Sequence, residues 1–230
     1  MHMPDLSPDQ LAADLAADGY ATRPLLTAHV CRDLASLYEE DNRFRKRIVM
    51  EQHVYGQGEY KYFGYPLPDP VAALRAALYP PLAAVANGWR RLMGEADSFP
   101  DTLDAYLALC HAAGQTRPTP LMLRYTAGGF NCLHQDLYGD LVFPLQAVVL
   151  LSTPGEDFTG GEFIMVEQRP RAQSRGMVVP LRLGEAAIFP VHHRPGMGVR
   201  GPYRLTMRHG VSRVHSGHRQ TLGIIFHDAA

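Results

Sequence analysis

The sequence predicts an α+β fold in which helices come first and an antiparallel β-sandwich, barrel or jelly roll follows. Up to residue 118, apolar residues recur at helical spacing. From Thr119 onward, short β-type runs alternate with Gly and Pro, and no helical run long enough to connect parallel strands lies between them. With 230 residues and 46% hydrophobic content, the chain can bury one sizeable core. We therefore expect one structural unit, with a helical region at 1–118 packing on a β core at 119–230.

Four helices are expected in the first half, and the first three open with residues that favour a helix start. They begin near Ser7, Thr27, Asp69 and Leu103. The adjacent residues Pro80 and Pro81 should break or kink the third helix, because proline lacks the backbone N–H and clashes with the preceding turn.

Residues 43–65 lie between the second and third helices and show no period. They combine the basic run RFRKR with the aromatic run GQGEYKYFGY. We expect a long basic and aromatic loop here, and long loops are often functional.

Seven strands are expected in the second half. They lie at 121–125, 146–151, 162–167, 178–183, 186–189, 205–214 and 221–226. Gly160 and Gly161 are interpreted as a turn before the third of these strands.

Charge is distributed unevenly along a chain whose formal net charge is only -1. Residues 169–219 contain ten arginines and one acidic residue, Glu185, which gives this segment a net charge of +9. The total charge excludes a uniformly basic nucleic-acid binder, whereas the segment predicts one electropositive face or groove, or a face of solvated and paired arginines.

Three residues form a candidate metal site. On an extended strand, His134 and Asp136 would point to the same face, because residues i and i+2 do so. His209 follows on a later strand, and H-x-D followed by a distal His is the order of the 2-His-1-carboxylate triad of non-haem iron. Such a triad leaves coordination positions open and suits Fe(II), although Mn, Co or Zn is tolerated.

A candidate carboxylate site follows the triad. Arg219 lies ten residues after His209, and Thr221 comes two residues later on the same strand face. An arginine with a neighbouring hydroxyl suits bidentate recognition of a carboxylate, which lysine cannot reproduce.

The order of these residues resembles the C-terminal signature of the Fe(II)/2-oxoglutarate dioxygenases. The resemblance implies a double-stranded β-helix, a cupin-like jelly roll preceded by helices. It also implies that His134, Asp136 and His209 hold Fe(II), that Arg219 and Thr221 bind the far carboxylate of the cosubstrate 2-oxoglutarate, and that O2 takes the remaining position. Tyr125 lies where related enzymes often place a tyrosine that hydrogen-bonds 2-oxoglutarate, and its other interpretation is a core tyrosine.

Longer stretches resemble an uncharacterised bacterial family labelled as oxygenases acting on damaged DNA. They are GEYKYFGYPLPDP, GQTRPTPLMLRY, NCLHQDLYGDLVFPLQ, FTGGEFIMVEQRPRAQSR and RHGVSRVHSGHRQTLGIIFHDA. This resemblance implies oxidative demethylation of alkylated nucleobases. The basic segment 169–219 and the loop 43–65 favour single-stranded or damaged DNA as a partner, with bases stacking on Tyr60, Tyr62 or Phe63.

Two other classes stay open. One is a dioxygenase that hydroxylates a prolyl or other protein side chain, or a small molecule. The other is a non-enzymatic cupin-like module or a zinc hydrolase with the same ligands, which would give Arg219 no role. Three cysteines without a CxxC pair, and no apolar run of membrane-spanning length, predict a cytoplasmic protein without a membrane anchor.

Overall fold

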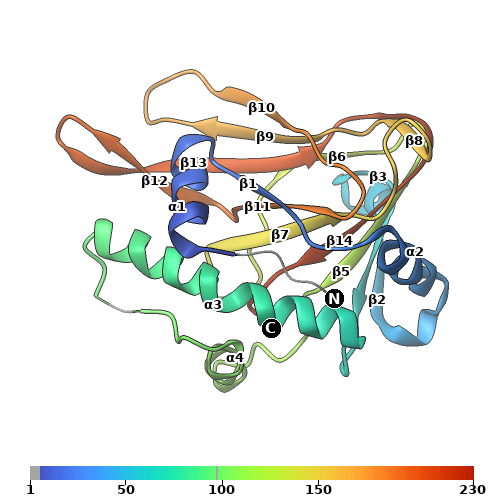
Figure 1. Cartoon of the computed structure of the whole chain (residues 1–230), viewed down its shortest axis with the longest axis horizontal. Helices are drawn as coiled ribbons and strands as arrows, with labels where there is room; N and C mark the ends of the chain where they lie inside the picture. Colours follow the sequence, from blue (N-terminus) through green and yellow to red (C-terminus); the bar gives the residue numbers. More distant parts are fainter. Residues whose placement is uncertain (1–5, 97) are drawn as a thin grey trace.

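Two antiparallel sheets face each other in a computed structural model that describes residues 6–96 and 98–230 (Figure 1). The larger sheet has the order β1-β11-β7-β14-β5-β4-β2, with β8 paired to β14. Its strands are β1 (Ala21–Pro24), β2 (Phe44–Val49), β4 (Glu59–Phe63), β5 (Leu121–Thr126), β7 (Leu145–Leu150), β8 (Phe158–Gly160), β11 (Glu185–Pro190) and β14 (Val214–Ile224).

The smaller sheet has the order β10-β9-β13-β6-β3, with β12 paired to β13. Its strands are β3 (Gly56–Gln57), β6 (Phe130–His134), β9 (Phe163–Gln168), β10 (Arg175–Val179), β12 (His193–Gly198) and β13 (Gly201–Val211). All seven predicted strands overlap observed ones. The antiparallel jelly-roll class expected from the sequence is therefore confirmed.

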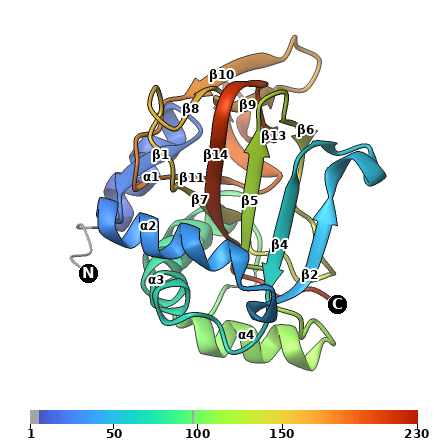
Figure 2. The ribbon, with the colours of Figure 1, turned by 90° about the vertical axis from the view of Figure 1, so that its right-hand side faces the viewer.

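Helices cover the outer side of the larger sheet (Figure 2). They are α1 (Pro8–Ala17), α2 (Ala28–Ser36), α3 (Asp69–Leu92) and α4 (Leu103–Ala112), with short 3-10 turns at Leu37–Glu39, Asp41–Arg43 and Met50–His53. One hydrophobic core lies between these helices and the larger sheet, and a second lies between the two sheets. The second core surrounds the functional cavity.

The two prolines of the third helix do not break it. Pro80 and Pro81 lie inside α3, which is one helix of 24 residues. Each proline costs about 3 kcal/mol in a helix interior, but the neighbouring residues Leu78, Tyr79 and Leu82 are completely buried. Burial of large side chains, at about 1.5 to 3 kcal/mol each, offsets that cost.

The prediction of a long loop at 43–65 was wrong, because this segment forms β2, β3 and β4. The strands were not predicted because this segment contains many charged residues. Arg47 forms an ion pair with Glu59 across the β2–β4 ladder, and the guanidinium of Arg45 lies 4.7 Å from the Tyr62 ring centre. Lys61 is buried, 2.7 Å from Asp41. Paired cations can occupy strands, so polarity alone did not indicate a loop.

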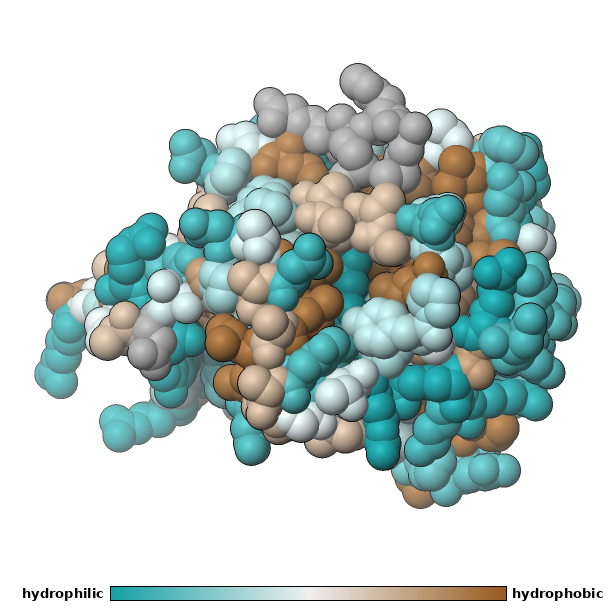
Figure 3. Space-filling view, turned by 90° about the horizontal axis from the view of Figure 1, so that it is seen from below, coloured by the Kyte–Doolittle hydropathy of each residue, from teal (hydrophilic) through white to brown (hydrophobic). Residues whose placement is uncertain are grey.

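Strands from both sides of residue 118 join the same sheets. β4 pairs with β5, β1 with β11, and β3 with β6. The region before residue 118 thus contributes strands as well as the expected helices. Seen from below, the surface mixes small hydrophobic and hydrophilic groups (Figure 3), and in the described part of the chain no helix is both long and apolar enough to cross a membrane.

Candidate active site

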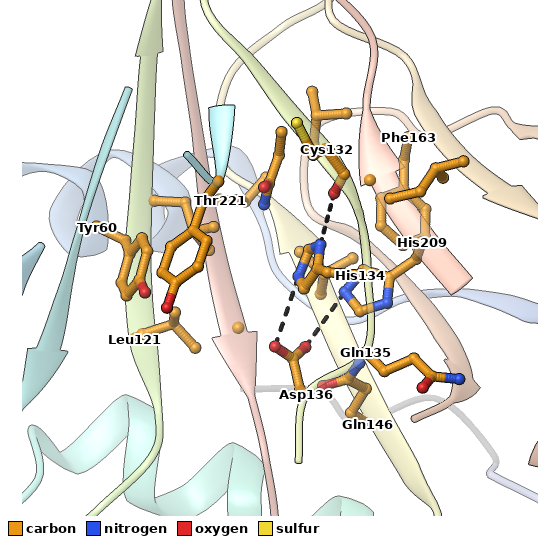
Figure 4. A pocket seen from close by; sticks show the side chains of 18 of the residues that line it. Tyr60, Leu121, Cys132, His134, Gln135, Asp136, Gln146, Phe163, His209 and Thr221 are labelled. Atoms are coloured by element: carbon orange, nitrogen blue, oxygen red, sulfur yellow. Dashed lines mark hydrogen bonds and ion pairs between the residues drawn. The ribbon is translucent and has the colours of Figure 1, made fainter. Parts of the chain in front are cut away.

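The predicted metal ligands meet at one point between the sheets (Figure 4). His134 is the last residue of β6, and His209 on β13 is its register partner, with the two imidazole centres 4.2 Å apart. The sequence predicted that Asp136 lies on an extended strand. In the structure it lies in the segment after β6. One ligand atom from each of the three residues lies within 4.8 Å of the others.

The charges around the triad favour an ionised Asp136. The carboxylate oxygens of Asp136 lie 3.5 Å from His134 Nε2 and 3.2 Å from His209 Nε2. Burial raises the pKa of Asp136, but hydrogen bonds from the two histidines outweigh it and hold this pKa well below its usual range. Burial and the neighbouring His134 lower the pKa of His209. Burial lowers the pKa of His134, but its hydrogen bond and attraction to Asp136 outweigh burial and raise this pKa. A metal ion would therefore bind in competition with a proton on His134.

Neighbouring groups fix how the ligands point. His134 Nδ1 lies 2.8 Å from the Cys132 carbonyl oxygen, a contact that turns the ring so that Nε2 faces Asp136 and the proposed metal position. The Tyr138 hydroxyl donates to Asp136 Oδ1 at 2.8 Å. Gln135 donates to the Met207 carbonyl oxygen at 2.8 Å and ties the segment after β6 to β13. Sequence spacing gave no indication of Tyr138 or Gln135 in these roles.

Arg219 and Thr221 line the same cavity, which has a volume of about 430 Å³. Both are buried on β14, and Arg219 is the register partner of the buried Tyr125 on β5. Burial lowers the pKa of Arg219 to about 10, which still leaves it protonated at neutral pH. Its Nε has no hydrogen-bond partner among the described residues, and neither has Gln146 Nε2 in the same cavity.

Gly161 makes room for the Arg219 side chain. Its φ is +63°, and a Cβ there would lie 2.9 Å from Arg219 Cδ. The predicted turn at Gly160 and Gly161 is present, with positive φ at both residues. The contact with Arg219 links residues 58 positions apart, so local sequence pattern could not indicate it.

The cavity mouth is apolar. Among the residues that line the cavity, four large apolar ones are exposed, namely Val54, Tyr55, Leu133 and Leu137. Of the aromatic residues proposed to stack on bases, Tyr60 lines the cavity. The proposed role for Phe63 is wrong, because Phe63 is completely buried and stacks on Phe44.

The basic segment contributes little to this cavity. Among its ten arginines, Arg219 is the one that lines it. His193 begins β12, and its ring packs edge-on against His192. These two histidines lie outside the His134, Asp136 and His209 group.

A family model described as "Oxygenase, catalysing oxidative methylation of damaged DNA" matches residues 58–229. The chain belongs to this oxygenase family. Membership confirms the resemblance seen in the sequence and the prediction that the chain is an oxygenase. Two uncharacterised proteins of Mycobacterium tuberculosis, MT2286 and Rv2227, are each 52% identical to it over 168 residues, covering 73% of this chain and 72% of theirs.

Solved structures support the fold of the oxygenase. A prolyl-4-hydroxylase of Pseudomonas putida matches with a TM-score of 0.60 and 16% identity, covering 97% of this chain and 100% of that one. An oxidoreductase of the 2OG-Fe(II) oxygenase family from Burkholderia pseudomallei matches with a TM-score of 0.54 and 15% identity, covering 100% of this chain and 98% of that one. The predicted jelly roll is thus a fold shared with oxygenases.

Proposed function

We propose that this oxygenase is an Fe(II)/2-oxoglutarate-dependent dioxygenase that oxidises a C–H bond of an alkylated base in DNA. The observation that carries the proposal is that one cavity holds a His-Asp-His group and a buried arginine, Arg219, whose Nε has no hydrogen-bond partner in the described part of the chain. A cupin-like binding module or a zinc hydrolase needs the first but not the second. The guanidinium carbon of Arg219 lies 5.8 Å from the ring centres of Tyr125 and Phe158. A buried charge without an ion-pair partner in contact is costly, so we expect a carboxylate ligand for Arg219.

The residues present fit both groups. His134, Asp136 and His209 would hold iron through two imidazole nitrogens and one carboxylate, a donor set that suits Fe(II). Arg219 would bind the far carboxylate of 2-oxoglutarate through its planar guanidinium, with the Thr221 hydroxyl as a second donor. Iron with bound 2-oxoglutarate and O2 supplies the oxidation, yielding succinate and CO2 while one oxygen atom enters the substrate.

The side chains around this site would position the ligands and exclude water. Tyr138 holds Asp136 in place, and Tyr125 lies fully buried beside Arg219, where it would contact 2-oxoglutarate. Phe163 and Phe189 pack against the His209 ring, with ring centres 5.8 and 4.7 Å away. These rings keep water from that side of the site and limit unproductive oxidation.

An extruded base suits the rest of the cavity. Tyr60, Leu121 and Leu123 supply aromatic and apolar walls, which are the surfaces that hold a flipped base. Hydroxylation of an N-methyl group gives a hemiaminal, which releases formaldehyde and leaves the unmethylated base. The family description supports a nucleic-acid substrate for this chemistry.

The test compares three substrates at equal concentration with Fe(II), ascorbate and 2-oxoglutarate. These are a methylated single-stranded oligonucleotide, the same oligonucleotide without methyl groups, and a proline-rich peptide. We expect formaldehyde and succinate in equal amounts from the methylated strand alone. Equal succinate from all three without formaldehyde would overturn the proposed substrate.

Hydroxylation of a protein side chain is the second candidate. The exposed apolar side chains at the mouth, including Tyr55 and Leu137, suit contact with an uncharged peptide. Such a peptide carries no phosphate groups and so needs no basic surface there. In the same assay, succinate formation driven by the peptide and a mass gain of one oxygen atom on it would favour this candidate.

A further inference from the structure

A second cavity lies at the other end of β13 from the metal ligands. It has a volume of about 660 Å³ and lies between α1, the C-terminal part of α3 and the β12–β13 hairpin. Figure 1 shows these elements together at one end of the molecule. We call this cavity the arginine groove, because Arg91, Arg169, Arg175 and Arg194 line it.

Three of these arginines surround one buried carboxylate. Glu167 on β9 is almost completely buried and is bound by Arg194 through its Nε and Nη2. Arg169 and Arg175 lie 3.7 and 3.6 Å from the same carboxylate, yet 60% and 52% of their side chains are exposed. One carboxylate cannot neutralise three guanidinium groups. Two positive charges are therefore left in excess and face solvent.

The rest of the groove adds charge and two partly buried aromatic side chains. Arg91 at the end of α3 lines it and is exposed, while Asp9 supplies one negative charge. Trp89 and Tyr203 also line it. Arginines that bind phosphate, next to aromatic rings on which bases stack, are the two features that single-strand binding surfaces combine.

We infer that the arginine groove binds the phosphate backbone of a single-stranded nucleic acid, with a base on Trp89. The inference rests on the proposed function and adds a second contact site outside the catalytic cavity. It also accounts for part of the positive charge of segment 169–219. Three arginines of this segment line the groove, whereas Arg219 is the one that lines the catalytic cavity.

β13 connects the two sites. Tyr203 and Leu205 line the groove, and His209 follows four residues after Leu205. At about 3.4 Å per residue in a strand, the sites are on the order of 15 to 20 Å apart along β13. Single-strand binding sites commonly cover about 4 to 16 nucleotides, so one strand can reach both.

Trp89 gives a direct readout, because it is the one tryptophan of the chain. The experiment titrates the full-length protein with a single-stranded oligonucleotide of about 12 nucleotides, a length inside that site-size range, and follows Trp89 emission at several salt concentrations. Mononucleotide, inorganic phosphate and polyglutamate are titrated in parallel. We expect the oligonucleotide to quench the emission at concentrations where the other three do not.

The double variant Arg169→Ala/Arg175→Ala tests the charge. Its control, Arg32→Ala/Arg182→Ala, removes two exposed arginines that line neither cavity. With about -0.7 in log K against log[salt] per phosphate contact, the groove variant should flatten the slope by about 1.4 and weaken binding about 25-fold near 0.1 M salt. The control should bind like the parent.

The results can distinguish failure of the groove inference from failure of the proposed catalytic function. Equal binding by the groove variant and its control, or polyglutamate binding as tight as the oligonucleotide, would overturn the inference. 2-Oxoglutarate binding should be the same in all variants, since none alters the catalytic cavity. A parent protein that binds the oligonucleotide through these arginines but not 2-oxoglutarate would refute the proposed function and leave the groove standing.

Discussion

His134 and His209 are register partners on β6 and β13, and their imidazole rings lie 4.2 Å apart. The ladder between the two strands therefore sets the spacing of two of the three proposed ligands. Asp136 completes the group from the segment after β6, where hydrogen bonds of Gln135 and Tyr138 hold the backbone and the carboxylate.

Replacing Asp136 with Ala should abolish stoichiometric Fe(II) binding, because two histidines alone provide too few ligands. The fold should survive, since the side chain lies in a loop that lines a cavity. Anaerobic Fe(II) titration and a thermal melt check both parts. Asp140→Ala, an exposed change four residues later, should bind iron like the parent. Parent-like iron binding by Asp136→Ala would show that the ligand set is wrong.

Replacing Arg219 with Lys should weaken 2-oxoglutarate binding although the charge is kept. Lysine loses the planar pair of donors, so about 1.5 to 3 kcal/mol should be lost, the range for a hydrogen bond to a charged group. That corresponds to roughly ten- to hundredfold in Kd. Calorimetric titration measures the change, and Arg213→Lys at an exposed position is the control. An unaltered Kd would leave the proposed role of Arg219 without support.

Replacing Gly161 with Ala should also weaken 2-oxoglutarate binding, because the new Cβ would push on Arg219 Cδ. Positive φ adds strain of its own, of order 1 kcal/mol. Gly155→Ala separates the two effects, since Gly155 has a φ of +84° but no neighbouring atom within 4 Å of the place its Cβ would take. Gly161→Ala should lose more stability, because its Cβ would also lie 2.9 Å from Val214 Cγ2. A weaker Kd is expected in Gly161→Ala alone. Equal Kd values in both variants would argue against the contact.

Replacing Asp228 with Ala should destabilise the whole fold. Its carboxylate is completely buried, 2.8 Å from Arg75 Nη2, and also accepts a hydrogen bond from the Tyr65 hydroxyl. Removing one partner of a buried pair strands the other charge, which costs about 3 to 5 kcal/mol. Asp14→Ala breaks a more exposed pair with Arg23 and should cost about 0 to 1 kcal/mol. Urea unfolding gives both values, and equal losses would contradict the importance of this buried pair.

The sequence predicted the site better than the first half of the fold. Spacing on strands was enough to bring Arg219 and Thr221 onto one face, and motif order was enough to select His209. The strands β2 and β4 were missed because cations such as Lys61 and Arg47 are neutralised by residues far away in sequence. Gly161 contacts a residue 58 positions away, which no local pattern could reveal. The hydrogen bond from Tyr138 to Asp136 joins residues only two positions apart, but it depends on the loop conformation after β6, which no periodic pattern indicates.

Conversion of 2-oxoglutarate to succinate by the purified protein, supplied with Fe(II), ascorbate and O2, tests the central claim most directly. The parent protein and Asp140→Ala should both form succinate, and Asp136→Ala should form none. Absence of succinate from the iron-loaded parent, or formation at the parent rate by Asp136→Ala, would contradict the assignment of this cavity as an Fe(II)/2-oxoglutarate site.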